Sequence, residues 1–187
     1  MRVISGSFRG KKLLDPKDIE TRPLKDLTKE SIFNIINHSN KFKIDLENSN
    51  ILDLFSGIGS FGIECLSRGA KNVIFVENYN RVLPILKKNL ISLKSIQNYR
   101  IIEQDINKGI NFANLDKKFH IIFLDPPYKD KNLENILTGI YEQKILDKNG
   151  IIIIHRHKKE QDKLPKVFNT IEEKKYGLSK IIFLSLF

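Results

Sequence analysis

From residue 50 onward, short apolar runs alternate with segments whose apolar residues recur every three to four positions. The runs have the length and composition of buried strands, and the segments between them have the periodicity of helices. This pattern is typical of an α/β fold with a mostly parallel sheet that carries helices on both faces. The expected strands cover residues 51–54, 72–76, 99–103, 119–124 and 150–154, and the expected helices cover residues 60–68, 82–93, 108–113 and 133–140.

The two ends of the chain follow other patterns. Residues 167–173 and 180–186 flank a glycine turn and predict an antiparallel pair of strands. Residues 2–14 predict a short β-hairpin with glycine at its bends. The apolar spacing that follows predicts a helix with Thr28 or Asp26 near its start.

The length of the chain limits its domain organisation. At 187 residues it can bury one full hydrophobic core and is short for two. We therefore expect residues 1–187 to form a single domain. Within it, residues 1–45 form an N-terminal extension and residues 46–187 form the α/β core.

The composition excludes several classes of protein. No apolar stretch approaches the ~20 residues of a membrane-spanning helix, and the N-terminus lacks the apolar segment of a secretory signal. With Cys65 as its single cysteine, the chain can form no disulfide framework and no cysteine-rich metal site. The four histidines have no spacing suited to zinc and are expected to be structural. We expect a monomeric, cytoplasmic protein that binds no metal and no membrane.

Positive charge is in excess along the chain. The 32 Lys and Arg residues outnumber the 22 Asp and Glu residues, which gives a net charge of +10 and a pI near 9.6. This excess favours a polyanionic partner, although AT-rich coding DNA produces a lysine-rich composition without one. The first twelve residues carry four positive charges and no acid, which predicts a nucleic-acid contact through Arg2, Arg9, Lys11 and Lys12.

A glycine-rich turn follows the first strand of the core. Gly57, Gly59 and Gly62 form a Gly-x-Gly-x-x-Gly pattern that allows a close approach of the backbone to a ligand at a helix N-terminus. Glu77 lies 20 residues after Gly57, where a carboxylate accepts hydrogen bonds from ribose hydroxyls. This pattern predicts a nucleotide cofactor but does not separate NAD from S-adenosylmethionine. The site is expected to include the flanking residues Phe55 and Asn78.

Two acidic residues favour S-adenosylmethionine. Asp53 lies immediately inside the turn, where a carboxylate suits a cationic amino group better than a pyrophosphate. Asp105 follows the third strand, where it can accept a hydrogen bond from an adenine amino group while Ile106 covers the ring. The alternative for Asp105 is a turn or helix cap.

The tetrapeptide Asp125-Pro126-Pro127-Tyr128 ends the apolar run of residues 119–124. An exocyclic amino nitrogen is a poor nucleophile because its lone pair is delocalised into the ring. A site that methylates it must therefore accept hydrogen bonds from the amino protons. Asp125 and the Pro126 carbonyl offer two acceptors, which the prolines hold in place. Tyr128 offers a stacking surface for an extruded base, worth ~1–3 kcal/mol. We assign these four residues to the catalytic site of a nucleobase methyltransferase.

These motifs and the N-terminal segment resemble the bacterial 16S rRNA guanine-N2 methyltransferases of the RsmD type over nearly the whole chain. The resemblance implies a Rossmann-like, seven-stranded class I fold and methyl transfer from S-adenosylmethionine to N2 of one guanine in 16S rRNA. It also implies a partly or fully assembled small ribosomal subunit as partner, and it adds Arg22 to the expected RNA contacts. The matching segments are Arg2-Val3-Ile4-Ser5-Gly6, Arg9-Gly10, Thr21-Arg22-Pro23, Lys29-Glu30-Ser31-Ile32-Phe33-Asn34, Asp53-Leu54-Phe55-Ser56-Gly57-Ile58-Gly59, Gly62-Ile63-Glu64, Ser67-Arg68-Gly69-Ala70, Phe75-Val76-Glu77 and Asp125-Pro126-Pro127-Tyr128.

The chain departs from the family pattern at two places. Leu24-Lys25-Asp26-Leu27 stands where the family has Thr-Thr-Asp-Arg, and His155 stands where the family usually ends a strand with an acid. Asp-Pro-Pro-Tyr is shared with adenine-N6 and other amino methyltransferases, so other bases in DNA or RNA stay open as substrates. An NAD-dependent oxidoreductase and a non-catalytic ribosome-assembly factor are the alternatives from other classes.

Overall fold

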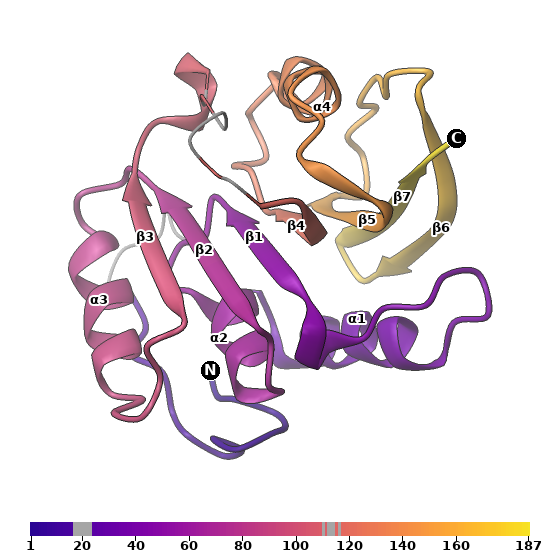
Figure 1. Ribbon diagram of the computed structural model, residues 1–187. Helices are drawn as coiled ribbons and strands as arrows, with labels where there is room; N and C mark the ends of the chain where they lie inside the picture. Colours follow the sequence, from indigo (N-terminus) through magenta and orange to yellow (C-terminus); the bar gives the residue numbers. More distant parts are fainter. Residues whose placement is uncertain (17–23, 110, 112–114, 116) are drawn as a thin grey trace.

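The computed structural model describes residues 1–16, 24–109, 111, 115 and 117–187. These residues form a seven-stranded sheet with the strand order β3-β2-β1-β4-β5-β7-β6 (Figure 1). Strands β1 to β5 are parallel to their neighbours among these five, and β7 is antiparallel to both β5 and β6. This confirms the α/β fold and the antiparallel C-terminal pair. The strands are β1 (Asn50–Leu54), β2 (Asn72–Glu77), β3 (Tyr99–Glu103), β4 (Phe119–Leu124), β5 (Leu146–His157), β6 (Phe168–Tyr176) and β7 (Ser179–Leu186).

Helices cover both faces of the sheet. Helices α1, α2 and α3 pack on one face and α4 packs on the other (Figure 1). Pro84 lies in the first turn of α3, where its missing N–H costs little, as the sequence predicts. In the described part of the chain the helices are α1 (Asp26–His38), α2 (Ser60–Ser67), α3 (Leu83–Ile91) and α4 (Leu133–Glu142), with short 3-10 helices η1 (Leu46–Asn48) and η2 (Ile106–Lys108).

The central strands are buried on both faces. Ile51 of β1 packs in the core that contains α1, α2 and α3, whereas its neighbour Leu52 packs in the core that contains α4. Ile153 and Ile154 of β5 divide between the two cores in the same way. Because successive residues of a strand point to opposite faces, a strand covered on both sides is apolar at nearly every position.

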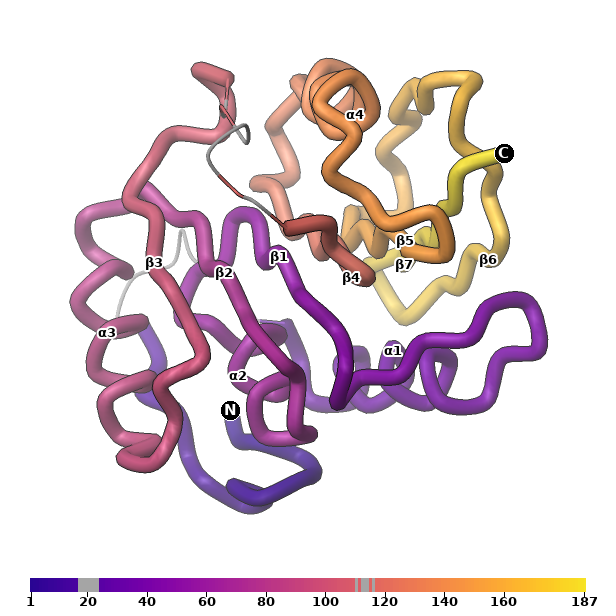
Figure 2. Tube along the Cα trace, viewed as in Figure 1, coloured from indigo at the N-terminus to yellow at the C-terminus, as the bar shows by residue number. Residues whose placement is uncertain are grey.

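The N-terminal extension packs onto the same core. The tube in Figure 2 shows this segment passing along the side of the sheet that carries α2 and α3. Glu64 of α2 is fully buried, and its carboxylate accepts hydrogen bonds from the backbone N–H groups of Ile4 and Ser5 at 2.7 and 2.9 Å. The buried ammonium of Lys29 in α1 lies 3.6 Å from the same carboxylate. Buried charges thus attach the extension to α2.

Two segments differ from the sequence-based expectation. The hairpin expected over residues 2–14 is present in irregular form: backbone hydrogen bonds join Val3 to Lys11 and Gly10 around an isolated antiparallel bridge between Arg2 and Lys12. The next N–H groups, of Ile4 and Ser5, donate to Glu64 and not across the hairpin. Where a helix over residues 108–113 is expected, the described residues show η2 ending at Gly109, whose φ of +85° breaks the helix. Residues 110, 112 and 113 lie outside the described part.

No helix that the structure describes combines the length and the apolar character needed to cross a bilayer.

Candidate active site

The glycine turn and the Asp125 corner meet at the point where the strand order reverses. β1 lies between β2 and β4, so the connections that leave β1 and β4 diverge at the carboxyl edge of the sheet. The backbone N–H of Asp125 donates to the carbonyl of Leu54 at 3.3 Å, which joins the two strand ends directly. Open α/β sheets bind ligands at such a crevice. The fold therefore brings together the two motifs that the sequence analysis singled out.

Glu77 organises the backbone of the glycine turn. One carboxylate oxygen accepts the N–H of Gly57 at 2.7 Å, and the other accepts the N–H groups of Asn78 and Tyr79 at 2.9 and 2.8 Å. Gly57 has a φ of +55°, in the left-handed region that glycine adopts without strain. Glu77 is 8% exposed, and its carboxylate is used mainly to hold the backbone of the glycine turn. A hydrogen bond from a ribose hydroxyl would have to use the lone pairs that remain.

The start of α2 approaches the sheet more closely than any side chain would allow. A Cβ added to Gly62 would lie 2.3 Å from the ring of Phe75. The N–H of Gly62 donates to Oδ2 of Asp53 at 2.9 Å. Gly59 caps the helix with a φ of +85°, and Phe55 adopts a positive φ of 57° although it is not a glycine. The turn is thus held in an unusual backbone shape by Asp53 below it and Glu77 beside it.

Asp53 is a buried carboxyl with unused bonding capacity. It is 1% exposed, and its Oδ1 has no hydrogen-bond partner among the residues that the structure describes. Burial raises the pKa of Asp53 well above its usual range, and the charges of Asp125 and Glu77 raise it further, against the N–H of Gly62. Three carboxyl groups therefore interact around the glycine turn, and the charges of Glu77 and Asp125 favour a cationic ligand over a pyrophosphate.

Asp105 acts as a helix cap in this structure. Its Oδ1 accepts the N–H of Asn107 at 3.0 Å at the start of η2. Ile106 is 4% exposed and packs in the α4 core. Both residues follow β3 and lie at the same carboxyl edge of the sheet as the glycine turn. Their contacts with an adenine stay a prediction.

The side chain of Asp125 is held by a histidine on the neighbouring strand. Nδ1 of His155, in β5, lies 2.7 Å from Oδ1 of Asp125. His155 is 6% exposed, and the Asp125 carboxylate raises its pKa through charge and hydrogen bonding, which together outweigh the opposing effect of burial. The pair orients one oxygen of Asp125 and leaves Oδ2 without a hydrogen bond from the described residues. The sequence analysis treated His155 as structural and did not foresee this contact.

The Asp125–His155 pair predicts a pH-dependent stability. The groups facing His155 are the Asp125 carboxylate and the Tyr128 ring, whose centroid lies 6.3 Å away. Since the folded-state pKa of His155 is raised, the pair's contribution is complete below the unfolded-state pKa of about 6.5. It is lost as the pH rises through the folded-state pKa. Urea unfolding of the wild type and of His155→Asn should therefore give free energies of unfolding that converge as the pH rises. A difference between the two proteins that does not change with pH would contradict the prediction.

A buried arginine fixes the loop that follows Asp125. Arg156 is 1% exposed and donates to the carbonyls of Pro127 and Asp130 at 3.0 and 2.8 Å. Its guanidinium also forms two hydrogen bonds with Asp162, at 3.0 and 2.7 Å. Such a bidentate pair is geometrically specific. Arg156 therefore holds residues 127–130 in one conformation, a role that the sequence analysis missed.

Pro126 is buried and Pro127 is exposed, so the tetrapeptide leaves the sheet as a turn. Tyr128 is half-buried and makes edge-to-face contacts with His155 and His157, with ring centroids 6.3 and 5.3 Å apart. Its hydroxyl lies 3.4 Å from Oγ of Ser179. These contacts fix the ring beside the Asp125 corner, and its role in stacking a base stays a prediction.

The basic N-terminal residues are spread along a loop that passes both ends of α2: Lys29 donates to the Arg2 carbonyl and to Ser60 at the start of that helix. The tip of their loop contacts the end of α2 opposite the glycine turn, since the N–H of Phe8 donates to Ser67 at 3.0 Å. The eight residues of α2 span ~12 Å. Arg9 and Lys12 are exposed, whereas the Lys11 ammonium donates to the carbonyl of Ser92. Arg2 is exposed and lies 3.8 Å from the carboxylate of Asp26, and Arg22 lies outside the described residues.

A family model described as conserved hypothetical protein 95 matches residues 1–185. The chain belongs to this family, which is the RsmD family. It is 36% identical over 184 residues to the putative rRNA methyltransferase YlbH of Bacillus subtilis, covering 97% of this chain and 96% of that one. It is 32% identical over 179 residues to ribosomal RNA small subunit methyltransferase D of Haemophilus influenzae, covering 95% and 90%.

Solved structures of the RsmD family's fold agree with this assignment. The putative methyltransferase yhhF of Escherichia coli superimposes with a TM-score of 0.80 at 26% identity, covering 100% of this chain and 97% of that one. The putative methylase HI0767 of Haemophilus influenzae gives 0.74 at 31% identity, covering 98% and 96%. The chain therefore has the Rossmann-like class I methyltransferase fold that the resemblance implies.

Proposed function

We propose that this protein transfers a methyl group from S-adenosylmethionine to the exocyclic N2 of one guanine in 16S rRNA. The substrate is a partly or fully assembled small ribosomal subunit, and the enzyme acts as a cytoplasmic monomer. The observation that carries the proposal is the Asp125 carboxylate at the strand end next to the glycine turn, with one oxygen fixed by His155 at 2.7 Å. The names of the Bacillus and Haemophilus relatives support ribosomal RNA as the polymer.

The residues around the glycine turn fit S-adenosylmethionine. This cofactor supplies an electrophilic methyl group on a cationic sulfur. Asp53, with its unpartnered buried Oδ1, and the charges of Glu77 and Asp125 favour a cationic ligand at this place. Gly57 and Gly59 provide the backbone approach, and Phe55, Gly62, Asn78, Asp105 and Ile106 complete the proposed pocket. An NAD pyrophosphate would meet the same carboxylates with repulsion.

Asp125 has the central role toward the substrate. Its carboxylate accepts a hydrogen bond from the amino group of the guanine, which draws electron density back onto N2 and aims the lone pair outward. His155 keeps the carboxylate from rotating, and Arg156 holds the carbonyls that follow it. Tyr128 stacks on the extruded base. Most of the rate enhancement then arises from positioning, since methyl transfer needs an in-line approach of nitrogen to the methyl group.

Mass spectrometry of methylated RNA tests the proposal. Small subunits from a strain lacking this protein are incubated with the purified enzyme and isotopically labelled S-adenosylmethionine, and the rRNA nucleosides are analysed. We expect one labelled N2-methylguanine. Labelled N6-methyladenine would instead support the alternative amino methyltransferase. Binding to the particle without any label would support a non-catalytic assembly factor.

A further inference from the structure

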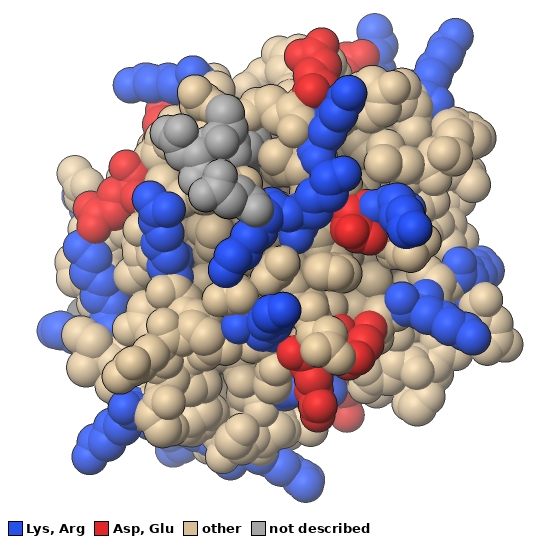
Figure 3. Space-filling view, in the orientation of Figure 1, with Lys and Arg blue, Asp and Glu red and all other residues tan. Residues whose placement is uncertain are grey.

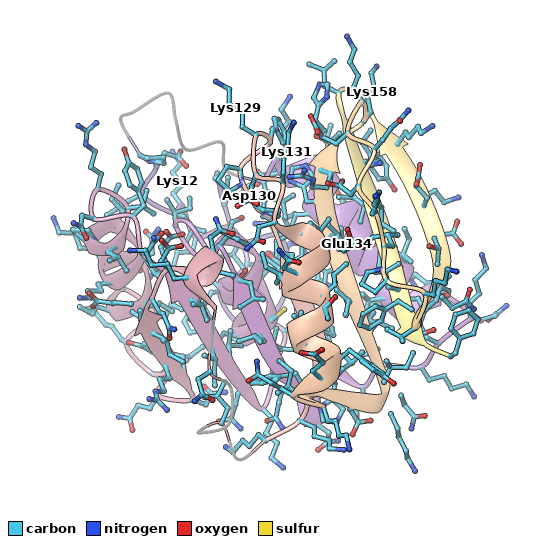
Figure 4. All side chains as sticks on the ribbon, turned by 90° about the horizontal axis from the view of Figure 1, so that it is seen from above. Lys12, Lys129, Asp130, Lys131, Glu134 and Lys158 are labelled. Atoms are coloured by element: carbon cyan, nitrogen blue, oxygen red, sulfur yellow. The ribbon has the colours of Figure 1, made fainter. Side chains whose placement is uncertain are left out.

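The net positive charge of the protein does not by itself indicate which face binds RNA. Lys and Arg side chains are spread over the face seen in Figure 3, with acidic groups between them. The positive groups best placed to bind a nucleic acid at the active site are those that lie beside the Asp125 corner and lack acidic partners. Four exposed lysines that follow the ends of β4 and β5 meet both conditions: Lys129, Lys131, Lys158 and its neighbour Lys159. The first three are labelled in Figure 4.

These lysines project from two loops that Arg156 ties together. Lys129 and Lys131 follow the Asp125 corner in the loop before α4, and Lys158 follows the end of β5. Arg156, two residues before Lys158, donates to the carbonyls of Pro127 and Asp130 on the first loop. In Figure 4 the three lysines are seen at the same end of the molecule, where β4 and β5 end.

The acidic groups nearby have their own partners. The Asp130 carboxylate accepts the N–H of Asn132 at 2.7 Å and the side-chain amide of Asn107 at 2.6 Å. The carboxylates of Asp162 and Glu160 face Arg156 at 2.7 and 3.9 Å. In contrast, none of the three lysines forms an ion pair with any residue in the described ranges.

We propose that Lys129, Lys131 and Lys158 bind the RNA phosphates that flank the target nucleotide. The inference rests on the proposed function and specifies how its substrate is held. A rigid loop with free ammonium groups next to the stacking ring of Tyr128 suits a backbone whose base is extruded into the corner. Phe8, at the tip of the N-terminal basic loop, bonds Ser67 at the far end of α2, so the neighbouring Arg9 would contact a more distant part of the RNA. Lys12 is seen in Figure 4 at the same end of the molecule as the three lysines.

Salt dependence of binding tests this assignment. Each phosphate contact to single-stranded RNA contributes about −0.7 to the slope of log K against log salt. The triple variant Lys129→Gln/Lys131→Gln/Lys158→Gln should therefore lower the steepness of that slope by roughly 2, measured with a 16S rRNA transcript and with small subunits. Its affinity at 0.15 M salt should fall on the order of tenfold or more.

A matched triple variant provides the control. Lys71, Lys118 and Lys148 are exposed: the first two directly precede β2 and β4, and Lys148 is the third residue of β5, so all three lie at the opposite edge of the sheet. Lys71→Gln/Lys118→Gln/Lys148→Gln removes the same charge and should leave the slope close to that of the wild type. Equal slopes for the two triple variants would overturn the inference. Titration of S-adenosylhomocysteine should give the same affinity in all three proteins.

The experiments distinguish a failure of this inference from a failure of the proposed function. If the wild type transfers no methyl group to rRNA, the proposed function fails whatever the slopes are. If the wild type methylates rRNA and the first triple variant keeps both its slope and its KM for small subunits, the inference fails alone.

Discussion

Replacing Asp125 by Asn should lower the rate of methyl transfer to rRNA on the order of 10²–10³-fold, the loss seen when one preorganised polar group at a reacting centre is removed. The amide Oδ1 can still accept the hydrogen bond from His155, so the shape of the corner is kept. The second oxygen, however, becomes an NH₂ donor that faces the amino donor of the guanine. Single-turnover assays with small subunits and labelled cofactor measure the change.

The effect should fall on the chemical step. Asp125 makes none of the hydrogen bonds that shape the glycine turn, so the affinity for S-adenosylhomocysteine should fall far less than the rate, by no more than the loss of one nearby charge. Glu142→Gln is the matched control, because this exposed residue ends α4 and its substitution makes the same carboxylate-to-amide change at the other edge of the sheet. Wild-type turnover by Asp125→Asn would rule out the assigned role.

Much of the fold follows from local sequence pattern. The parallel strands were predictable because burial on both faces makes them continuously apolar. Helices α1, α3 and α4 were predictable because only one side of each is buried, whereas all residues of α2 are buried. β5 was predicted too short. It runs from Leu146 to His157, whereas the apolar pattern covers only residues 150–154. The polar residues at its C-terminal end pair with β7, and pairing of this kind leaves no mark on hydrophobicity. At its start Leu146 pairs with Phe119 of β4, and an irregularity follows before Ile151.

The candidate site was predicted where its residues are close in sequence. The glycine turn and the Asp125 corner are each a short motif, and their meeting follows from the rule that ligands bind where the strand order reverses. His155 and Arg156 were missed because their partners lie about thirty residues away on another strand. A signal was present, since three polar residues follow the apolar run of β5 at the edge where β4 also ends.

The charge pattern of the sequence was the least informative about which basic residues lie near the Asp125 corner. Four basic residues in the first twelve predict a nucleic-acid contact, which stays a prediction. The tip of their loop bonds Ser67 at the far end of α2, whereas Leu14 bonds Asn89, which also donates to the Ile58 carbonyl in the glycine turn. Net charge says which polymer a protein favours, but only the packing of the loops says which lysines stand beside the chemistry.

Arg156→Met should destabilise the protein by about 3–5 kcal/mol, the range for a buried ion pair that loses one partner. Methionine fills a similar volume but leaves the Asp162 carboxylate, which is 9% exposed, without its guanidinium. It also leaves the carbonyls of Pro127 and Asp130 without their donor. Equilibrium unfolding in urea measures the loss, with a lower midpoint and an unchanged slope if the transition stays two-state.

A second variant separates the stability of the fold from the position of the loop. In Arg156→Met/Asp162→Leu the uncompensated carboxylate is gone, so a large part of the lost free energy of unfolding should return. The carbonyls of Pro127 and Asp130 still lack the guanidinium, so the loop that carries Lys129 and follows Asp125 stays unfixed. Methyl transfer should therefore remain low in the double variant although its stability recovers. Recovery of both together would mean that Arg156 stabilises the fold without positioning the corner, because a merely structural role predicts that activity follows stability.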